Sequence, residues 1–273
     1  MTESGVPALF GLPAVQVVAV ALASLLCGFV GTFVVLRRLV ALGGGIAHAA
    51  FGGIGIAVVV GFEPRFGAAA VAVGAAALLA GLPRERSDRQ DALIGVLWAV
   101  GMALGMVLLA GAPAGDSDVE GYLFGDIATV DRADVVTLAA LVAIVLVVHA
   151  RFGRELVATA FDPEHARLQG LPVRGLTLLG LLLVALSLVA LLEMVGVVLA
   201  IALLAIPPLV ALRWLRGLPA VVAGAIVVAA AMSLAGLALG ASAGWPAGPT
   251  IVLVGGAALV LSRLAPARAT RAG

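Results

Sequence analysis

One stretch of the chain decides its fold class. Residues 175–212 read GLTLLGLLLVALSLVALLEMVGVVLAIALLAIPPLVAL, and the only charged residue among them is Glu193. A helix needs about 17–25 mostly apolar residues to cross the core of a bilayer, so this stretch is too long for one ordinary span. Glu193 and Gly196 mark the only break in it. We therefore expect two membrane spans here, at 175–192 and 194–212.

The rest of the chain follows the same pattern. The sequence is 63% hydrophobic and 11% charged, whereas soluble domains are about 45–50% apolar and about 25% charged. Because lipid leaves no backbone polar group satisfied from outside, each apolar run is expected to be a helix. The predicted fold is an all-α polytopic transmembrane helical bundle of about nine spans, with eight possible. The predicted spans are 14–36, 42–61, 66–82, 92–111, 135–150, 175–192, 194–212, 218–240 and 249–264.

The arginines give the predicted bundle an orientation. All 16 basic residues are arginine, and the segments that follow odd-numbered spans hold all of them except Arg65 and Arg132. By the positive-inside rule these arginine-rich segments are cytoplasmic. No basic stripe suited to nucleic acid is present, and the single cysteine, Cys27, offers no thiolate cluster for a metal. Residues 1–273 are expected to form one domain that crosses a lipid bilayer several times.

A histidine stands out in the second predicted span. His48 lies between two glycine clusters, in GGGIAHAAFGG at 43–53. A neutral imidazole inside a bilayer is a candidate functional group and a common ligand for zinc, manganese or iron. The alternative is that His48 bonds to a neighbouring helix in a tightly packed interface.

Glu193 is the only carboxylate set deep in an apolar stretch. If a short outer turn separates the sixth and seventh spans, Glu193 lies at the outer membrane interface and needs no function. If it lies within the membrane instead, it marks an ion path or a partner for His48.

Two polar segments between spans also carry patterns. The cytoplasmic loop, about 151–175, contains FDPEHARLQGL at 161–171, where Asp162 can cap a helix that starts at Pro163 and Gly170 can stop it. The outer loop, about 112–134, contains EGYLFGDI at 120–127, which is amphipathic. Either segment can be a solvated connector. The alternatives are a surface that docks another protein and, for the outer segment, closure of the mouth of a pathway.

Taken together, these elements resemble the ABC-3 family of metal-ion permeases, the membrane subunits of bacterial zinc, manganese and iron importers. The likeness runs from about Val17 to Leu264. The elements that carry it are Arg37-Arg38 with the Gly-x-x-x-Ala-His-Ala segment that ends at Ala49, YLFGDI at 122–127, Phe161-Asp162 with Ala166-Arg167 and Gly170, VGVVL at 195–199 with ALLAIP at 202–207, and PAGPTIVL at 246–253.

The resemblance implies that residues 1–273 are one permease domain in the inner (cytoplasmic) cell membrane, a bundle of the type of ABC-3 and vitamin-B12-like importer permeases. Its implied partners are cytoplasmic ABC ATPase subunits, a second permease copy in a homodimer and an extracytoplasmic metal-binding protein. The chain has no glycine-rich loop followed by Lys-Ser/Thr, so it is expected to be a transport subunit and no enzyme, with ATP hydrolysis in a separate partner. No permanently bound cofactor is expected, because the divalent metal, zinc or manganese, is the cargo.

The resemblance also implies roles for named residues. The segment that couples to the ATPase would comprise Asp162, Glu164, Ala166, Arg167 and Gly170. The outer gate would comprise Tyr122, Phe124, Gly125 and Asp126.

One position departs from the family pattern. The family commonly has an aspartate four residues before the histidine, on the same helical face, and here that position is Gly44. A single histidine is a poor site for a dication, and manganese in particular prefers oxygen ligands. The predicted metal ligands are therefore His48 and, as the candidate for the missing charge, Glu193.

Three functions follow from these observations. The leading hypothesis is the permease of an ATP-driven divalent metal importer, with zinc ahead of manganese because the histidine is present where the carboxylate is not. The second is an importer for a larger solute, a chelated metal or a vitamin, for which Gly44 would widen a path. The third is an ATP-independent secondary transporter or a membrane-embedded enzyme, although the chain lacks Gly-x-Ser-x-Gly and His-Glu-x-x-His.

Overall fold

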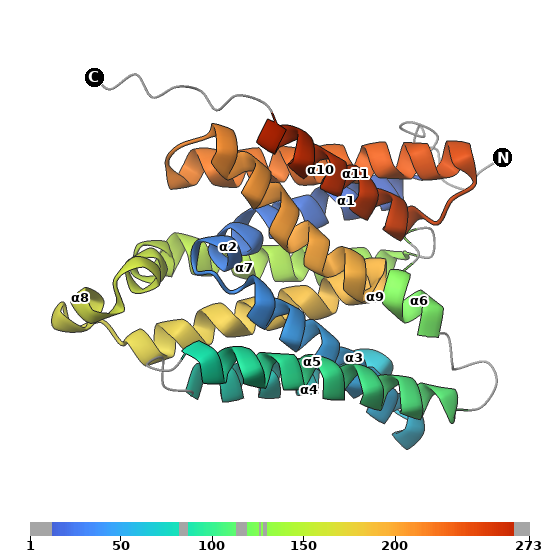
Figure 1. Ribbon diagram of the computed structural model, residues 1–273, viewed down its shortest axis with the longest axis horizontal. Coiled ribbons are helices and arrows are strands. Elements are labelled where there is room, and N and C mark those ends of the chain that lie inside the picture. Colours follow the sequence, from blue (N-terminus) through green and yellow to red (C-terminus); the bar gives the residue numbers. More distant parts are fainter. Residues whose placement is uncertain (1–12, 82–86, 113–118, 126, 128–129, 265–273) are drawn as a thin grey trace.

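Every regular element that the structure describes is helical, as the composition predicts. The computed structural model describes residues 13–81, 87–112, 119–125, 127 and 130–264. Its elements, labelled in Figure 1, are α1 (Ala14–Leu26), the π-helix η1 (Cys27–Gly31), α2 (Thr32–Leu36), α3 (Val40–Val60), α4 (Pro64–Gly81), α5 (Ser87–Ala110), α6 (Val119–Phe124), α7 (Arg132–Phe161), α8 (Pro163–Leu168), α9 (Val173–Trp214), α10 (Leu218–Ala243) and α11 (Ala247–Leu264).

Eight helices in the described part of the chain are long and apolar enough to cross a membrane. The first is continuous from Ala14 to Leu36 and contains the π-helical turn of η1. The fifth, α7, is longer than predicted, because it was expected to end at Ala150 and continues to Phe161. The extension carries Arg151, Arg154 and Glu155. These long polar side chains favour a helix as much as apolar ones do, so the end of the apolar run is not the end of the helix.

The longest helix, α9, is two helices joined at Gly196. Gly196 has φ 75° and ψ 167°, a backbone conformation that is essentially restricted to glycine. The two arms, 173–195 and 197–214, diverge from this point like the arms of a V (Figure 1). The predicted division of the apolar stretch is therefore present, and its position is Gly196. With α9 counted as two spans, the eight helices give the nine crossings that the hydropathy predicts.

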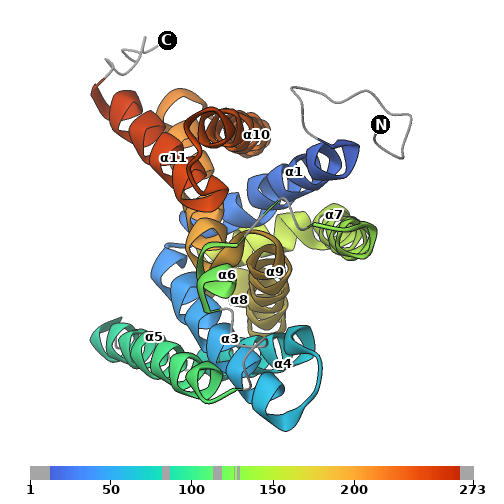
Figure 2. The same cartoon turned by 90° about the vertical axis from the view of Figure 1, so that its right-hand side faces the viewer.

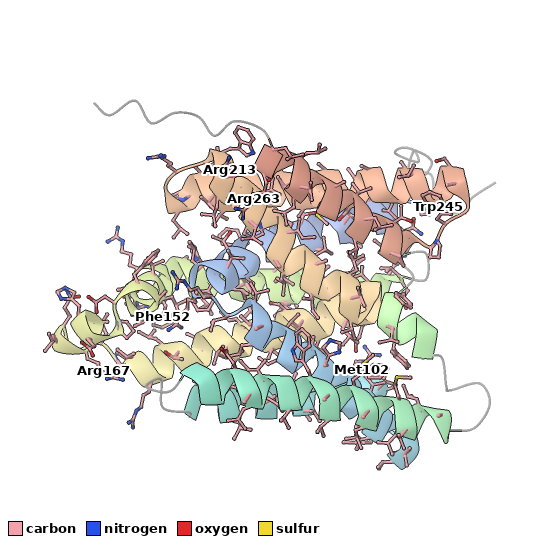
Figure 3. The ribbon with its side chains drawn as sticks, viewed as in Figure 1. Met102, Phe152, Arg167, Arg213, Trp245 and Arg263 are labelled. Carbon is pink, nitrogen blue, oxygen red and sulfur yellow. The ribbon has the colours of Figure 1, made fainter. Side chains whose placement is uncertain are left out.

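The two ends of the bundle differ in their side chains. α8 lies at one end and α6 at the opposite end (Figure 1). Arg167 and Arg213 lie toward the α8 end, whereas Trp245 lies at the α6 end (Figure 3). This separation agrees with the alternation of arginine-rich and arginine-poor loops, from which the α8 end is predicted to face the cytoplasm.

α9 joins two groups of helices. One group consists of α3, α4 and α5, and the other contains α1, α10 and α11, with α9 between them (Figure 2). The first group packs backbone against backbone: a Cβ atom on Gly53 of α3 would lie 2.3 Å from the carbonyl oxygen of Gly67 on α4. Small residues allow this approach, which is a common basis of helix association in lipid.

Candidate metal site and the polar segments around it

His48 lies in the middle of α3, about 12 Å of helical rise from its first residue. Its side chain is partly buried. The Nδ1 atom is buried and has no hydrogen-bond partner among the described residues. The predicted alternative, a histidine bonded to a neighbouring helix, therefore finds no partner for this nitrogen. A neutral imidazole with one uncommitted nitrogen can accept a hydrogen bond or bind a metal ion.

The neighbour of His48 is an aromatic residue that the sequence did not single out. Trp98 on α5 has its ring centroid 5.1 Å from that of the His48 imidazole, with an angle of 55° between the ring planes. The indole Nε1 donates a hydrogen bond to the carbonyl oxygen of Ala41, 3.3 Å away. Trp98 therefore spans the face of α3 from Ala41 to His48.

The indole occupies the space beside Gly44. A Cβ atom on Gly44 would lie 2.5 Å from Cζ2 and 2.9 Å from Cε2 of Trp98, which is closer than any real contact. The cavity that Gly44 does line has a volume of about 10 Å³, which is room for one water molecule at most. Gly44 thus does not widen a path here, because the indole of Trp98 on α5 fills the space that a side chain at residue 44 would take.

Glu193 has its own set of charged neighbours. Its side chain is exposed, and it interacts electrostatically with Arg65, Asp134 and Glu63, with His48 absent from this group. Arg65, at the start of α4, forms an ion pair with Glu63 in the turn between α3 and α4. The structure therefore places Glu193 with charged residues of the α3–α4 turn and the start of α7. His48 is not among the groups that act electrostatically on Glu193, so the pairing of the two as ligands stays a prediction.

Among the described residues, no group of three or more His, Cys, Asp or Glu side chains is arranged to hold a metal ion. The predicted site therefore consists of one imidazole from this chain, with Trp98 as its wall.

The predicted capped helix is present in the segment that is predicted to be cytoplasmic. Asp162 is the N-cap of α8, and its carboxylate accepts a hydrogen bond from the backbone N–H of His165 at 2.9 Å, with Pro163 in the first turn. Gly170 ends the turn with φ 78°, as expected for a glycine that stops a helix. Ala166 is buried against the body of the protein, whereas Glu164, Arg167 and Leu168 are exposed. α8 thus presents a polar rim around an apolar tip, Leu168, which is 87% exposed.

The segment that is predicted to be the outer loop contains α6, which lies against the bend of α9. Phe124 is partly exposed, and Tyr122 packs against the apolar core. Gly125 has φ 63°, and a Cβ atom on it would lie 2.1 Å from the carbonyl carbon of Val195. Asp126, the remaining predicted gate residue, lies outside the described residues.

Three glycines form a junction at this point: Gly125 after α6, Gly196 at the bend of α9 and Gly248 at the start of α11. A Cβ atom on Gly196 would lie 2.5 Å from the nitrogen of Gly125, and one on Gly248 would lie 2.2 Å from the carbonyl oxygen of Phe124. We call these three residues the glycine junction. Three backbone segments meet there without side chains between them, so a substitution at any of the three must push them apart.

Comparisons with known proteins agree with this architecture. A family model described as the ABC 3 transport family matches residues 12–265. An uncharacterized membrane protein of Synechocystis sp. is 37% identical over 246 residues, which cover 90% of this chain and 88% of that protein. The manganese transport system membrane protein MntC of Halalkalibacterium halodurans is 30% identical over 236 residues, which cover 86% of this chain and 81% of that protein.

A solved structure shares the fold. PsaBC from Streptococcus pneumoniae, determined in complex with a Fab, matches with a TM-score of 0.80 and 27% sequence identity, over 90% of this chain and 89% of the matched chain. The helices, the broken α9 and the family match over nearly the whole sequence point the same way: this multi-pass membrane protein belongs to the ABC 3 transport family.

Proposed function

We propose that this chain is the membrane permease of an ATP-driven importer for a divalent transition-metal ion, with zinc ahead of manganese. The observation that carries the proposal is His48, an imidazole in the middle of a membrane helix with its Nδ1 atom buried and uncommitted. In a member of a transport family, such a group is best explained as a ligand of the cargo.

The relatives support a metal as the cargo. MntC of Halalkalibacterium halodurans is named as a membrane protein of a manganese transport system, and ScaB of Streptococcus gordonii as a manganese import permease. The choice of zinc rests on the ligand type. Imidazole suits zinc, whereas carboxylate and water oxygens suit manganese, and the position one turn before His48 holds no side chain.

The partners follow from the same proposal. The exposed tip of α8, with Glu164, Arg167 and Leu168, is where a cytoplasmic ABC ATPase would dock. α6 and the glycine junction would close the outer mouth, on which an extracytoplasmic binding protein would release the ion. A second copy of the permease would complete the pathway. ATP binding would then move α8 and reorient the bundle between outward and inward access.

Glu193 has a different part in this proposal from that of His48. With Glu63, Asp134 and Arg65 nearby, its carboxylate belongs to a net acidic group, which raises the local concentration of cations at the mouth. Glu193 would thus attract the ion, and His48 would bind it.

The larger-solute alternative loses its main support, because the space beside Gly44 is filled by Trp98. No observation favours a secondary transporter or an enzyme over the importer.

The test is metal uptake by the reconstituted transporter, with His48→Ala and Glu193→Gln compared side by side. We expect His48→Ala to lower zinc uptake by at least about tenfold, as loss of a ligand or its support does, and Glu193→Gln to lower only the initial rate at low zinc. His149→Ala is the matched control, because it also removes an imidazole. His149 is on α7, and its ring centroid lies 5.0 Å from that of Phe29. Normal uptake by the His48 variant would refute the site.

A further inference from the structure

Trp98 is placed to decide which side chains can accompany His48. Residues 44 and 48 lie four apart on α3 and therefore share one face, where their side chains would meet. The Trp98 indole lies over this face: it is within 3.0 Å of an ideal Cβ atom on Gly44, within 3.3 Å of one on Gly45 and 5.1 Å from the imidazole of His48.

A hydrogen bond and the close approach of α5 to α3 both hold the indole in this position. Its Nε1 atom is anchored to the carbonyl oxygen of Ala41, one turn before Gly45, and α5 approaches α3 closely enough that a Cβ atom on Gly101 would lie 2.5 Å from the carbonyl oxygen of His48. The two backbones are in contact beside the indole, which leaves no room for it to move deeper between the helices. In this arrangement the indole therefore fills the space that a side chain at residue 44 would take.

We propose that Gly44 and Trp98 act as a pair that determines the metal specificity of the His48 site: the indole fills the place that a second, oxygen ligand at residue 44 would need, and this favours zinc over manganese. This inference rests on the proposed function, because it takes His48 to bind the cargo.

The selection follows from ligand chemistry. A carboxylate at residue 44 would stand one turn from the imidazole and supply the hard oxygen ligand that manganese prefers. With the indole there instead, the chain offers one borderline nitrogen ligand beside an apolar wall. Zinc binds imidazole well. Manganese has the lower affinity for such sites in general, and the missing oxygen ligand lowers its affinity more than that of zinc.

The test is a pair of substitutions in the full transporter. Gly44→Asp alone should disrupt packing, because its Cβ atom meets the rigid indole. Trp98→Ala alone should leave the preference for zinc unchanged, because it adds no ligand. Gly44→Asp with Trp98→Ala should accept the carboxylate and raise manganese uptake relative to zinc uptake by about tenfold or more, the size of effect that ligand-shell changes have on metal affinity.

The matched control is Gly43→Asp. It adds the same charge to the same helix, one residue away and on a different face, where a Cβ atom has only an ordinary contact of 3.9 Å with Leu188. Gly43→Asp should not change the ratio of manganese to zinc uptake. The readouts are uptake of radioactive zinc and manganese by proteoliposomes, measured from mixtures, and thermal stability of each purified variant.

Each outcome bears on one statement. An unchanged ratio in a folded double variant overturns the role of Trp98, even if zinc uptake by the unsubstituted transporter is normal. Equal stability of Gly44→Asp and Gly43→Asp also overturns it, because the indole would then exclude nothing. If the unsubstituted transporter carries neither metal, the proposed function fails first, and this inference fails with it.

Discussion

The glycine junction makes a quantitative prediction about Gly196. In Gly196→Ala the new side chain has two costs. The backbone at φ 75° and ψ 167° costs roughly 1–3 kcal/mol for a residue other than glycine. The Cβ atom would also lie 2.5–2.6 Å from three backbone atoms of residues 123–125, and overpacking of this kind costs roughly 1–3 kcal/mol more. The expected loss of folding free energy is therefore about 2–6 kcal/mol.

Two other glycines separate these costs. Gly217 has φ 82° but nothing within 4 Å of an added Cβ atom, so Gly217→Ala pays only for the backbone, about 1–3 kcal/mol. Gly74 lies inside α4 with open space around it, so Gly74→Ala should be neutral or stabilise the protein by up to about 1 kcal/mol.

The assay is thermal unfolding of the three purified variants in one detergent, followed by loss of the monodisperse species. The expected order of melting temperatures is Gly74→Ala highest, Gly217→Ala intermediate and Gly196→Ala lowest. A Gly196 variant as stable as the Gly217 variant would mean that α6 does not press on the bend of α9, and the glycine junction would have to be abandoned.

Two further predictions concern other parts of the bundle. Asp162→Ala removes the N-cap of α8 and should destabilise that helix by about 1 kcal/mol; metal uptake per ATP hydrolysed should fall in the reconstituted transporter while zinc binding by the permease is unchanged, and unchanged coupling would contradict a role for α8. Gly53→Ala places a methyl group 2.3 Å from the carbonyl oxygen of Gly67 and should lower the melting temperature. If the Gly53 variant were as stable as the Gly74→Ala variant, α3 and α4 would be able to move apart without loss of stability.

The spans were predictable from the sequence because one physical quantity controls them. The bilayer sets the length of an apolar helix, and a change from apolar to polar residues marks its ends. The division of the longest run was predictable for a related reason, since Glu193 and Gly196 mark a break in it; the sequence placed the break at Glu193, and the structure places it three residues later, at Gly196. The rule fails at α7, where polar residues continue the helix beyond the membrane run.

The candidate site was predictable only in part. His48 is conspicuous because an imidazole is rare in an apolar helix. Trp98 is not conspicuous, because a tryptophan is an ordinary residue in an apolar run. Its importance depends on which helix α5 packs against. The pairing of α3 with α5 is a tertiary feature. For the same reason the sequence left two alternatives for Glu193, a position at the outer interface and a partnership with His48, and the structure gives it charged neighbours from the α3–α4 region and from α7.

The bend of α9 also determines whether residues 173–214 cross the membrane once or twice. If residues 173–214 crossed the membrane once, α10 and α11 would be turned over, and the arginines at 213, 216 and 263 would face the opposite compartment from Arg167. Reporter fusions that fluoresce or are labelled on only one side of the membrane would detect this inversion directly. Gly196 contributes no side chain, yet it determines which compartment every later loop of the chain is exposed to.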